Sequence, residues 1–205
     1  AFRVSTARFA NVAFSNGSLL DGFIHRLSKK QPLTCPEDIK RFFVTPEQSG
    51  QICLLSTFLG ESGNIFFPKL DFHNDQIYFK EIALDFLKDN GFEPELVNSE
   101  NEAKEFDFVK YPSRYPIYFF KTDTSGEKTF EEFYTDVEDY NINTYHALGV
   151  INTPDVKISF EDIEADFEDV FSNYKSQKSD IIAVIQQYVP DFNHIETGKH
   201  LDQKM

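Results

Sequence analysis

The feature that most restricts the fold is an extended stretch that turns sharply into an amphipathic helix over residues 7–27. The letters are ARFANVAFSNGSLLDGFIHRL, and apolar residues alternate with small or polar ones from Phe2 to about Val12, as in a strand. Ser18 is a good helix N-cap with Asp21 at the third helical position, and leucine and phenylalanine then repeat every four residues. Strand, tight turn and helix in this order predict an α/β protein whose turn offers backbone N–H groups to a phosphate.

Extended and helical segments continue to alternate as far as residue 125. The letters TPEQSGQICLLSTFLG predict a helix that begins after Thr45, with Pro46 at its first position and Gln48 closing a capping box. Its expected buried stripe consists of Ile52, Leu55 and Leu59. Further strands are predicted at NIFFPKL, EPELVNS and PIYFFKTD, and further helices at FKEIALDFLKDNGF and, as a short piece, at ENEAKEF.

From Phe130 onward the chain changes character and becomes acidic. Residues 131–175 hold twelve acidic residues and two lysines, whereas residues 1–45 hold seven basic and three acidic ones. The letters SFEDIEADFEDVF, with Ser159 as N-cap, and DIIAVIQQYVP predict amphipathic helices. We therefore expect an α/β, substrate-binding part over residues 1–130 and a mainly helical acidic extension over residues 131–205.

Composition excludes several classes of function. The net charge of −14 argues against a nucleic-acid-binding protein, which needs a basic face to displace counterions. No apolar run approaches the roughly 20 residues of a membrane span. Two cysteines are too few for a disulfide framework and predict a cytoplasmic protein, and neither they nor the five histidines show metal-ligand spacing.

Three short segments could carry binding chemistry. Gly17 and Ser18 begin a helix with open N–H groups and a hydroxyl, and Asn11 on the preceding strand points an amide toward the same place. Arg41 precedes an aromatic pair and a helix, where a guanidinium could grip a phosphate with two N–H groups. The structural alternatives are a helix cap at Ser18, a hydrogen bond at the strand end for Asn11, and a surface salt bridge for Arg41.

A third segment, DTSGEKTFEEF, allows a tight turn at Gly126. Glu127 and Lys128 beside that turn could contact ligand hydroxyls or phosphate oxygens, and an ordinary charged turn explains the spacing equally well.

Four segments taken together resemble a known family. RFANVAFSNGSLL, IKRFFVTPEQSG, NIFFPKL and SGEKTFEEF, in this order, are similar to the C-terminal part of extended short-chain dehydrogenase/reductase enzymes that act on nucleotide sugars. The pattern most resembles UDP-N-acetylglucosamine 4,6-dehydratases, which show R-x-x-N-V-x-x-S-x-G-S, T-R-F-x-x-T, P-K and R-P-G-E-K-x-x-E. The resemblance covers about residues 3 to 135 and implies a Rossmann-type α/β fold.

The resemblance implies roles by position. Asn11 and the helix start at Gly17 and Ser18 would hold the sugar and diphosphate of a UDP-N-acetylhexosamine, and Arg41 would bind the diphosphate. Glu127 would lie near the ribose or the phosphates. The chain departs from the family where Thr124-Ser125 replaces Arg-Pro, so that Lys128 or Lys121 would supply the missing cation, and where Lys40 replaces a threonine.

The resemblance also shows which parts of such an enzyme are missing. The family binds NAD or NADP through a glycine-rich turn and uses a Tyr-x-x-x-Lys pair as its base, and this chain has no G-x-x-G-x-x-G. Tyr174 and Lys178 have the right spacing but follow all the other motifs, which indicates a chance match. We therefore assign no catalytic residue to this chain, and expect an upstream Rossmann portion to carry the cofactor and the chain alone to be inactive.

The expected function is then the UDP-sugar-binding half of a UDP-N-acetylglucosamine 4,6-dehydratase in bacterial polysaccharide or nonulosonic-acid synthesis, acting as a homo-oligomer without a membrane or nucleic-acid partner. One alternative is a UDP-sugar epimerase of the same superfamily. Another, from a different class, is a non-catalytic binding or assembly module that docks a protein through its acidic helices.

Overall fold

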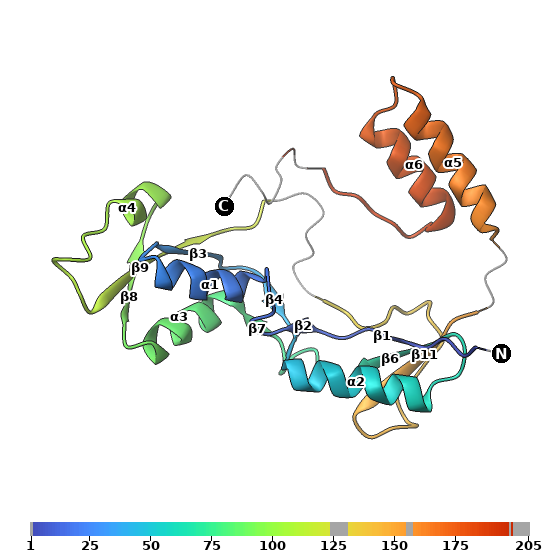
Figure 1. Ribbon diagram of the computed structural model, residues 1–205, viewed down its shortest axis with the longest axis horizontal. Coiled ribbons are helices and arrows are strands. Elements are labelled where there is room, and N and C mark those ends of the chain that lie inside the picture. Colours follow the sequence, from blue (N-terminus) through green and yellow to red (C-terminus); the bar gives the residue numbers. More distant parts are fainter. Residues whose placement is uncertain (1, 124–130, 155–157, 197, 199–205) are drawn as a thin grey trace. The chain divides into compact units, whose positions relative to one another are not determined.

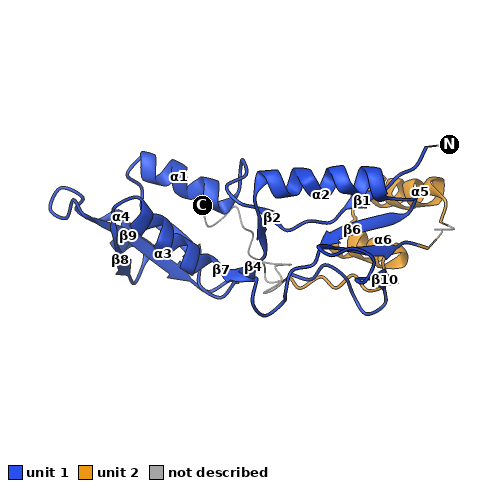
Figure 2. Cartoon of the chain, turned by 90° about the horizontal axis from the view of Figure 1, so that it is seen from below, with its two compact units in different colours: residues 1–122, 128–153 blue, residues 123–127, 154–205 orange. Residues whose placement is uncertain are grey.

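The computed structural model describes residues 2–123, 131–154, 158–196 and 198 (Figure 1). The chain divides into two compact units, which Figure 2 shows in different colours. The first contains residues 1–122 and 128–153, and the second contains residues 123–127 and 154–205.

One sheet of the first unit has the strand order β1-β6-β11-β10. The strands are β1 (Thr6–Ala7), β6 (Asn64–Pro68), β10 (Tyr140–Asn141) and β11 (Leu148–Asn152). β1 runs parallel to β6, whereas β11 is antiparallel to both β6 and β10. β1 is an edge strand of this sheet, so one side of its backbone has no strand partner among the described residues.

The sequence analysis did not predict β11, and expected residues 131–205 to be mainly helical. In the structure residues 131–153 belong to the first unit, because Leu148, Val150 and Ile151 are buried against β6. The pairing of β11 with β6 joins residues about 80 positions apart, so no local pattern predicts it. Within residues 131–205, the described helices, Phe160–Ser172 and Lys178–Tyr188, lie in the second unit.

A second sheet is parallel throughout and has the order β3-β9-β8. Its strands are β3 (Leu33–Pro36), β8 (Glu93–Val97) and β9 (Arg114–Phe120). Helices α1 (Leu19–Ser28) and α3 (Phe79–Asp89) pack against β3, and the short α4 (Glu100–Lys104) packs against β8 and β9. Phe23, Leu33 and Ile117 are fully buried between these layers, which places the main core of the unit here.

Two short strand pairs connect the sheets. β2 (Asn11–Val12) runs parallel to β5 (Phe43–Val44), and β4 (Lys40–Arg41) is antiparallel to β7 (Ile77–Tyr78). Each pair is only two residues long, but together they position Asn11 and Arg41, two of the residues that the sequence singled out.

The helix starts follow the sequence closely. The Ser18 side chain accepts a hydrogen bond from the Asp21 N–H, as an N-cap does. Helix α2 (Pro46–Leu59) begins with the predicted capping box, in which Thr45 and Gln48 each accept a hydrogen bond from the other's backbone N–H. These predictions are confirmed because every bond that defines a cap lies within four residues of sequence.

The predicted buried stripe of α2 is wrong in two of its three residues. Ile52 is buried, but Leu55 and Leu59 are 42% and 41% exposed. α2 packs on β1 and β6 through the face that carries Ile52 and Ser56. The Ser56 carbonyl oxygen accepts a hydrogen bond from the Ser5 hydroxyl, which holds this face of the helix near the edge strand.

The second unit contains α5 (Phe160–Ser172) and α6 (Lys178–Tyr188), both predicted from the sequence. The two helices contact each other, and the Asp166 carboxylate accepts hydrogen bonds from Gln187 and Tyr188 on α6. The hydrogen bond to Asp166 raises the pKa of Tyr188 to about 12. No residue of either helix is fully buried.

Tyr115 provides a first test of the core. Its hydroxyl lies 2.9 Å from the Gln31 carbonyl oxygen and 3.2 Å from that of Arg26, and can donate to one of them at a time. Burial raises the pKa of Tyr115 from 10.0 to about 12, so the folded state favours the neutral phenol. Tyr115→Phe is expected to lower the free energy of unfolding by about 1–2 kcal/mol, because the carbonyl oxygens lose their donor.

The sign of the pH effect follows from the raised pKa. The stabilising contribution of Tyr115 is complete below pH 10 and decreases as the pH rises from 10 toward 12. Urea unfolding at pH 8, 10 and 11 should show a steeper loss of stability in the wild type than in Tyr115→Phe. Parallel pH profiles of the two proteins would contradict this assignment.

Candidate functional site

A cavity of about 140 Å³ lies where β2 meets α1. Three polar residues, Asn11, Ser15 and Ser18, contribute to its lining. The rings of Phe43 and Phe79, which meet edge to face with centroids 5.7 Å apart, line it together with three aliphatic side chains. No lysine, arginine or histidine is among the lining residues that the structure describes.

The start of α1 is already engaged by the protein itself. The Gly17 N–H donates to an Asp21 carboxylate oxygen at 3.0 Å, and the Asp21 N–H donates to the Ser18 hydroxyl at 3.1 Å. Gly17 has a φ of +78°, a conformation that favours glycine and explains this residue at the turn. Gly17 and Ser18 therefore act as a self-capped helix start, and Ser18 in addition faces the cavity.

Asn11 is held by two acceptors from distant parts of the chain. Its Nδ2 lies 3.3 Å from the Phe42 carbonyl oxygen and 3.1 Å from both carboxylate oxygens of Glu131. Since the amide nitrogen carries two hydrogens and both neighbours are pure acceptors, the orientation of the amide is fixed.

Arg41 is bound to the same carboxylate. Its Nε lies 3.3 Å from Oε1 of Glu131, and its Nη1 donates to the Lys40 carbonyl oxygen at 2.8 Å. The Arg41 side chain is 12% exposed and that of Glu131 is 35% exposed. The backbone oxygen of Glu131 accepts a hydrogen bond from the buried Gln76, so Glu131 is fixed at both its side chain and its backbone.

The structure thus brings together part of the predicted site. Asn11 and Ser18 line one cavity, while Arg41 is joined to Asn11 through Glu131 and is not among the lining residues. Glu127 and Lys128 lie outside the residues that the structure describes. The sequence analysis gave Glu131 no role, although it is the last glutamate of the R-P-G-E-K-x-x-E pattern; only its position in that motif could have drawn attention to it.

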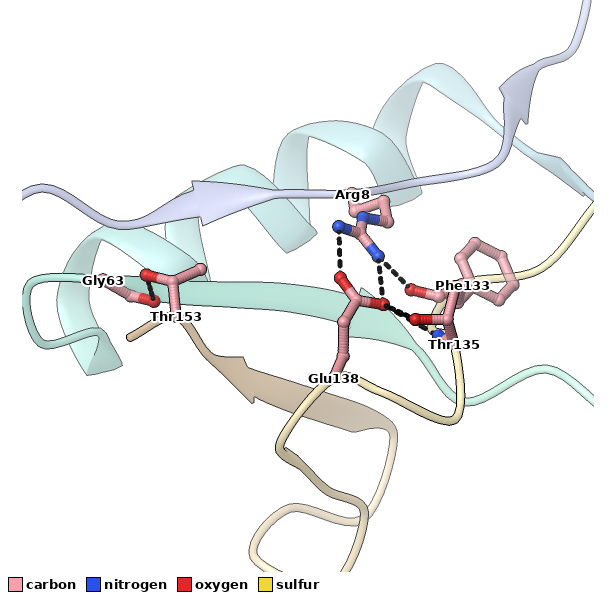
Figure 3. A network of polar contacts seen from close by, with 6 residues as sticks. All are labelled: Arg8, Gly63, Phe133, Thr135, Glu138 and Thr153. Atoms are coloured by element: carbon pink, nitrogen blue, oxygen red, sulfur yellow. Dashed lines mark hydrogen bonds and ion pairs between the residues drawn. The ribbon is translucent and has the colours of Figure 1, made fainter. Parts of the chain in front are cut away.

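A second arginine–glutamate pair holds the segment that follows Glu131. Arg8, in the first motif, makes two hydrogen bonds to the Glu138 carboxylate at 2.9 and 3.1 Å and a third to the Phe133 carbonyl oxygen at 2.8 Å (Figure 3). Glu138 also accepts from the Thr135 N–H at 2.8 Å. This network ties residues 133–138 to the chain just after β1.

The Glu138 pair predicts a loss of stability in acid. The hydrogen bond from Arg8 holds the pKa of Glu138 below its usual 4.5. The contribution of the pair is therefore complete above pH 4.5 and is lost as the pH falls through the lowered pKa. Urea unfolding between pH 6 and 3 should show a steeper acid loss in the wild type than in Glu138→Gln; equal slopes would contradict the assignment.

Tyr174 and Lys178, which have the spacing of a Tyr-x-x-x-Lys base, do not lie on one helix. Tyr174 is 89% exposed in the turn after α5, and Lys178 is the first residue of α6, where it pairs with Glu196. A Tyr-x-x-x-Lys base needs both side chains on one helical face, so this geometry agrees with a chance match.

Comparison with known proteins identifies the family. The model of a family described as "Polysaccharide biosynthesis protein" matches residues 1–152, about three quarters of the chain. The chain belongs to this family of polysaccharide biosynthesis proteins. The match ends with β11, so it includes Glu131 and the segment that follows it and excludes α5 and α6.

Two similar proteins are much longer than this chain. An uncharacterized membrane protein of Methanocaldococcus jannaschii is 24% identical over 148 residues, which are 72% of this chain and 39% of that protein. The X-ray structure of Pen from Bacillus thuringiensis is similar with a TM-score of 0.54 and 18% identity, covering 74% of this chain and 40% of Pen. The likeness to Pen concerns the fold, and supports the α/β, Rossmann-type C-terminal part expected from the sequence.

The polysaccharide biosynthesis protein described here therefore spans about two fifths of each of these similar proteins. Within the described part of the chain, every helix is too short or too polar to cross a membrane.

Proposed function

We propose that this chain is the substrate-binding part of a UDP-N-acetylglucosamine 4,6-dehydratase and binds a UDP-N-acetylhexosamine. The observation that supports this most is the cluster of Asn11, Glu131 and Arg41 beside a cavity lined by hydroxyls and aromatic rings. Aromatic rings with a few placed polar groups are typical of sites for small molecules. The membership in a polysaccharide biosynthesis family supports a sugar nucleotide as the ligand.

Each residue of the cluster has a separate task in this proposal. Arg41, fixed through its Nε by Glu131, directs its guanidinium toward the diphosphate, which it binds by charge-assisted hydrogen bonds. Asn11 and Ser18 contact the sugar in the cavity. Glu127 and Lys128 are assigned to the ribose and the phosphates from the motif alone.

The dehydratase reaction oxidises C4 of the sugar, removes water across C5 and C6 and returns a hydride to C6, for which NAD or NADP supplies the hydride chemistry. The described residues of this chain do not fit a dinucleotide. At the strand–turn–helix start before α1, the Gly17 N–H is taken by Asp21, and Gly17 is the only glycine in residues 13–18, where a dinucleotide-binding turn needs several. We derive no step through the cofactor and assign it to a further part of the fold.

One surface of the first unit is suited to such a further part. Leu54, Leu55, Phe58 and Leu59 of α2 are between 41% and 73% exposed, and α2 packs on the edge strand β1. An edge strand presents unpaired N–H and C=O groups that can pair with a further strand, and a large exposed apolar patch is typical of an interaction surface. A Rossmann portion whose strand pairs with β1 would cover this surface and would account for the greater length of the similar proteins.

Two experiments test the proposal at different levels. Isothermal titration of the 205-residue chain with UDP-N-acetylglucosamine, with UDP-glucose as a matched ligand lacking the acetamido group, should show tighter binding of the former. Residues 1–152 should then replace the matching region of a longer family member that has dehydratase activity. The chimera is expected to form UDP-4-keto-6-deoxy-N-acetylhexosamine, detected by mass spectrometry as loss of water.

The chain alone, mixed with UDP-N-acetylglucosamine and NAD⁺, is expected to form no keto sugar. If the chimera inverts C4 of the sugar and the sugar loses no water, the activity to assign is that of a UDP-sugar epimerase and not of a dehydratase. If neither the chain nor the folded chimera binds any UDP-sugar, the proposal is refuted. The alternative function, a non-catalytic binding or assembly module, would then stand in its place.

A further inference from the structure

An aromatic stripe lies exposed on helix α5 of the second unit. Phe160 and Phe171 are 71% and 67% exposed. Phe167 lies between them along the helix, and its ring stacks on that of Phe171 with the centroids 5.9 Å apart. Successive rings are separated by seven and by four positions, so all three share one face of the helix. Exposed apolar side chains that gather on one face are typical of a surface that another protein covers.

The neighbouring helix does not cover this stripe. α6 contacts α5, and the two helices lie side by side in Figure 1. The Asp166 carboxylate accepts hydrogen bonds from Gln187 and Tyr188 of α6. At 3.6 residues per turn, Asp166 lies on a different face of α5 from Phe160 and Phe171. The contact with α6 therefore leaves the two outer rings of the stripe exposed.

Carboxylates border the stripe and have no basic neighbour on the helix. α5 contains six acidic residues and no lysine, arginine or histidine. Glu164 and Glu168 are exposed, lie four positions apart on the side next to the rings, and make no ion pair with a residue that the structure describes. Like charges at this spacing, and carboxylates in the last turn of a helix, destabilise the helix. Nothing in the described chain offsets this cost, whereas a cationic partner would.

This charge distribution decides between the possible partners. A second copy of α5 would bring two acidic helices together, and their carboxylates would repel each other. An anionic lipid surface is disfavoured for the same reason, because helices that lie on such membranes carry lysine and arginine beside their apolar face. A basic amphipathic helix can place its apolar side chains on the rings and its cations opposite Glu164 and Glu168.

We propose that the stripe of Phe160, Phe167 and Phe171, bordered by Glu164 and Glu168, is a docking surface for a basic amphipathic helix of another protein. The match to the family model ends at residue 152, so this surface belongs to a part of the chain outside that match. The proposal does not depend on the sugar nucleotide, and a helix docked on α5 should leave the affinity for the UDP-sugar unchanged.

A synthetic amphipathic helical peptide of leucine and lysine provides the probe. Fluorescence anisotropy of the labelled peptide with the 205-residue chain should show binding that weakens as the salt concentration rises. The matched peptide with glutamate in place of every lysine should not bind. In nuclear magnetic resonance of the ¹⁵N-labelled chain, the basic peptide should shift the backbone amides of α5. It should leave those of α2 in place, because the exposed leucines of α2 have only one acidic residue on their helix.

The apolar part of the surface is tested by removing its two most exposed rings. Phe160→Ser combined with Phe171→Ser should weaken binding of the basic peptide by about tenfold or more. Circular dichroism should show that the helices are retained, because both side chains are exposed. Val109→Ser combined with Val137→Ser is the matched control, which removes two apolar side chains that are 91% and 81% exposed in the first unit. The control should leave the affinity unchanged.

The acidic part of the surface is tested without changing the rings. Glu164→Gln combined with Glu168→Gln should weaken binding by about three- to tenfold at low salt. Asp89→Asn combined with Glu105→Gln removes the same charge from exposed positions of the first unit. This control should change the affinity by less than about twofold, because the removed charges do not border the stripe.

Equal binding of the lysine and glutamate peptides would overturn the proposal, and so would equal affinity of the basic peptide for the serine variant of α5 and the wild type. Self-association of the chain that the serine variant abolishes would also overturn it, as would binding to phosphatidylglycerol vesicles with shifts in α5. Binding of the basic peptide at α5 by a chain that binds no UDP-sugar would support the docking surface and count against the proposed function.

Discussion

Gly149→Ala is expected to lower the free energy of unfolding by about 2–3 kcal/mol, through overpacking in the centre of the β1-β6-β11-β10 sheet. A Cβ added at Gly149 would lie 2.1 Å from Cζ of Phe67, its partner across β11 and β6. Phe67 is 1% exposed and its ring stacks on Phe133 at 6.1 Å, so it has no space into which to move.

Gly50→Ala is the matched control, with the same added methyl group and the opposite expected sign. Gly50 lies within α2 and an added Cβ would meet no atom within 4 Å. The control should raise the free energy of unfolding by about 0.5–1 kcal/mol, because alanine favours a helix more than glycine does. Urea unfolding followed by circular dichroism measures both; a Gly149→Ala protein as stable as the wild type would show that Phe67 does not close over this glycine.

Arg41→Ala is expected to weaken the binding of UDP-N-acetylglucosamine by about 1.5–3 kcal/mol, roughly 10- to 150-fold, through loss of a charged hydrogen bond to the diphosphate. The substitution also leaves Glu131 without its arginine partner. Arg41→Lys keeps the positive charge without the planar guanidinium, and should recover only part of the affinity. Isothermal titration with the UDP-sugar and with N-acetylglucosamine should show that the loss is confined to the UDP-sugar.

Arg8→Ala provides the control for this experiment. Both arginines pair with a glutamate, but Arg8 supports the fold through Glu138 and the Phe133 carbonyl oxygen. Removing the Arg8 side chain should lower the free energy of unfolding by about 1–2 kcal/mol, because its partly exposed ion pair with Glu138 is lost. The affinity for the UDP-sugar should stay within about twofold, because Arg8 does not line the cavity. A similar loss of affinity in Arg41→Ala and Arg8→Ala would mean that Arg41 supports binding by stabilising the fold and not by contacting the ligand.

Part of the site could be predicted from sequence because it depends on neighbours in the chain. Ser18 is an N-cap and lines the cavity, and Asn11 directly precedes the turn, as expected. The engagement of the Gly17 N–H by Asp21 was equally local, yet the sequence analysis treated that N–H as open to a phosphate. The helix pattern predicted the geometry of this turn correctly, but it did not show that the Gly17 N–H already donates a hydrogen bond to Asp21.

The direction of the Asn11 amide could not be predicted in this way. It depends on Glu131, which is 120 residues away, and on the Phe42 carbonyl oxygen. The exposure of Leu55 and Leu59 is a similar case, because helical spacing shows which residues share a face but not what that face packs against.

The sequence by itself determined the α/β class, the helix caps at Ser18, Thr45 and Ser159 and the strands β6, β8 and β9. Only the tertiary structure decided that β11 joins β6, that Glu131 links Asn11 to Arg41, and that the Asn11 amide nitrogen faces Glu131 and the Phe42 carbonyl oxygen. The physical reason is the length of chain between the partners. Caps and strands follow from bonds and side-chain periods over a few residues, whereas these contacts join residues 80 to 120 positions apart that meet only after the chain has folded.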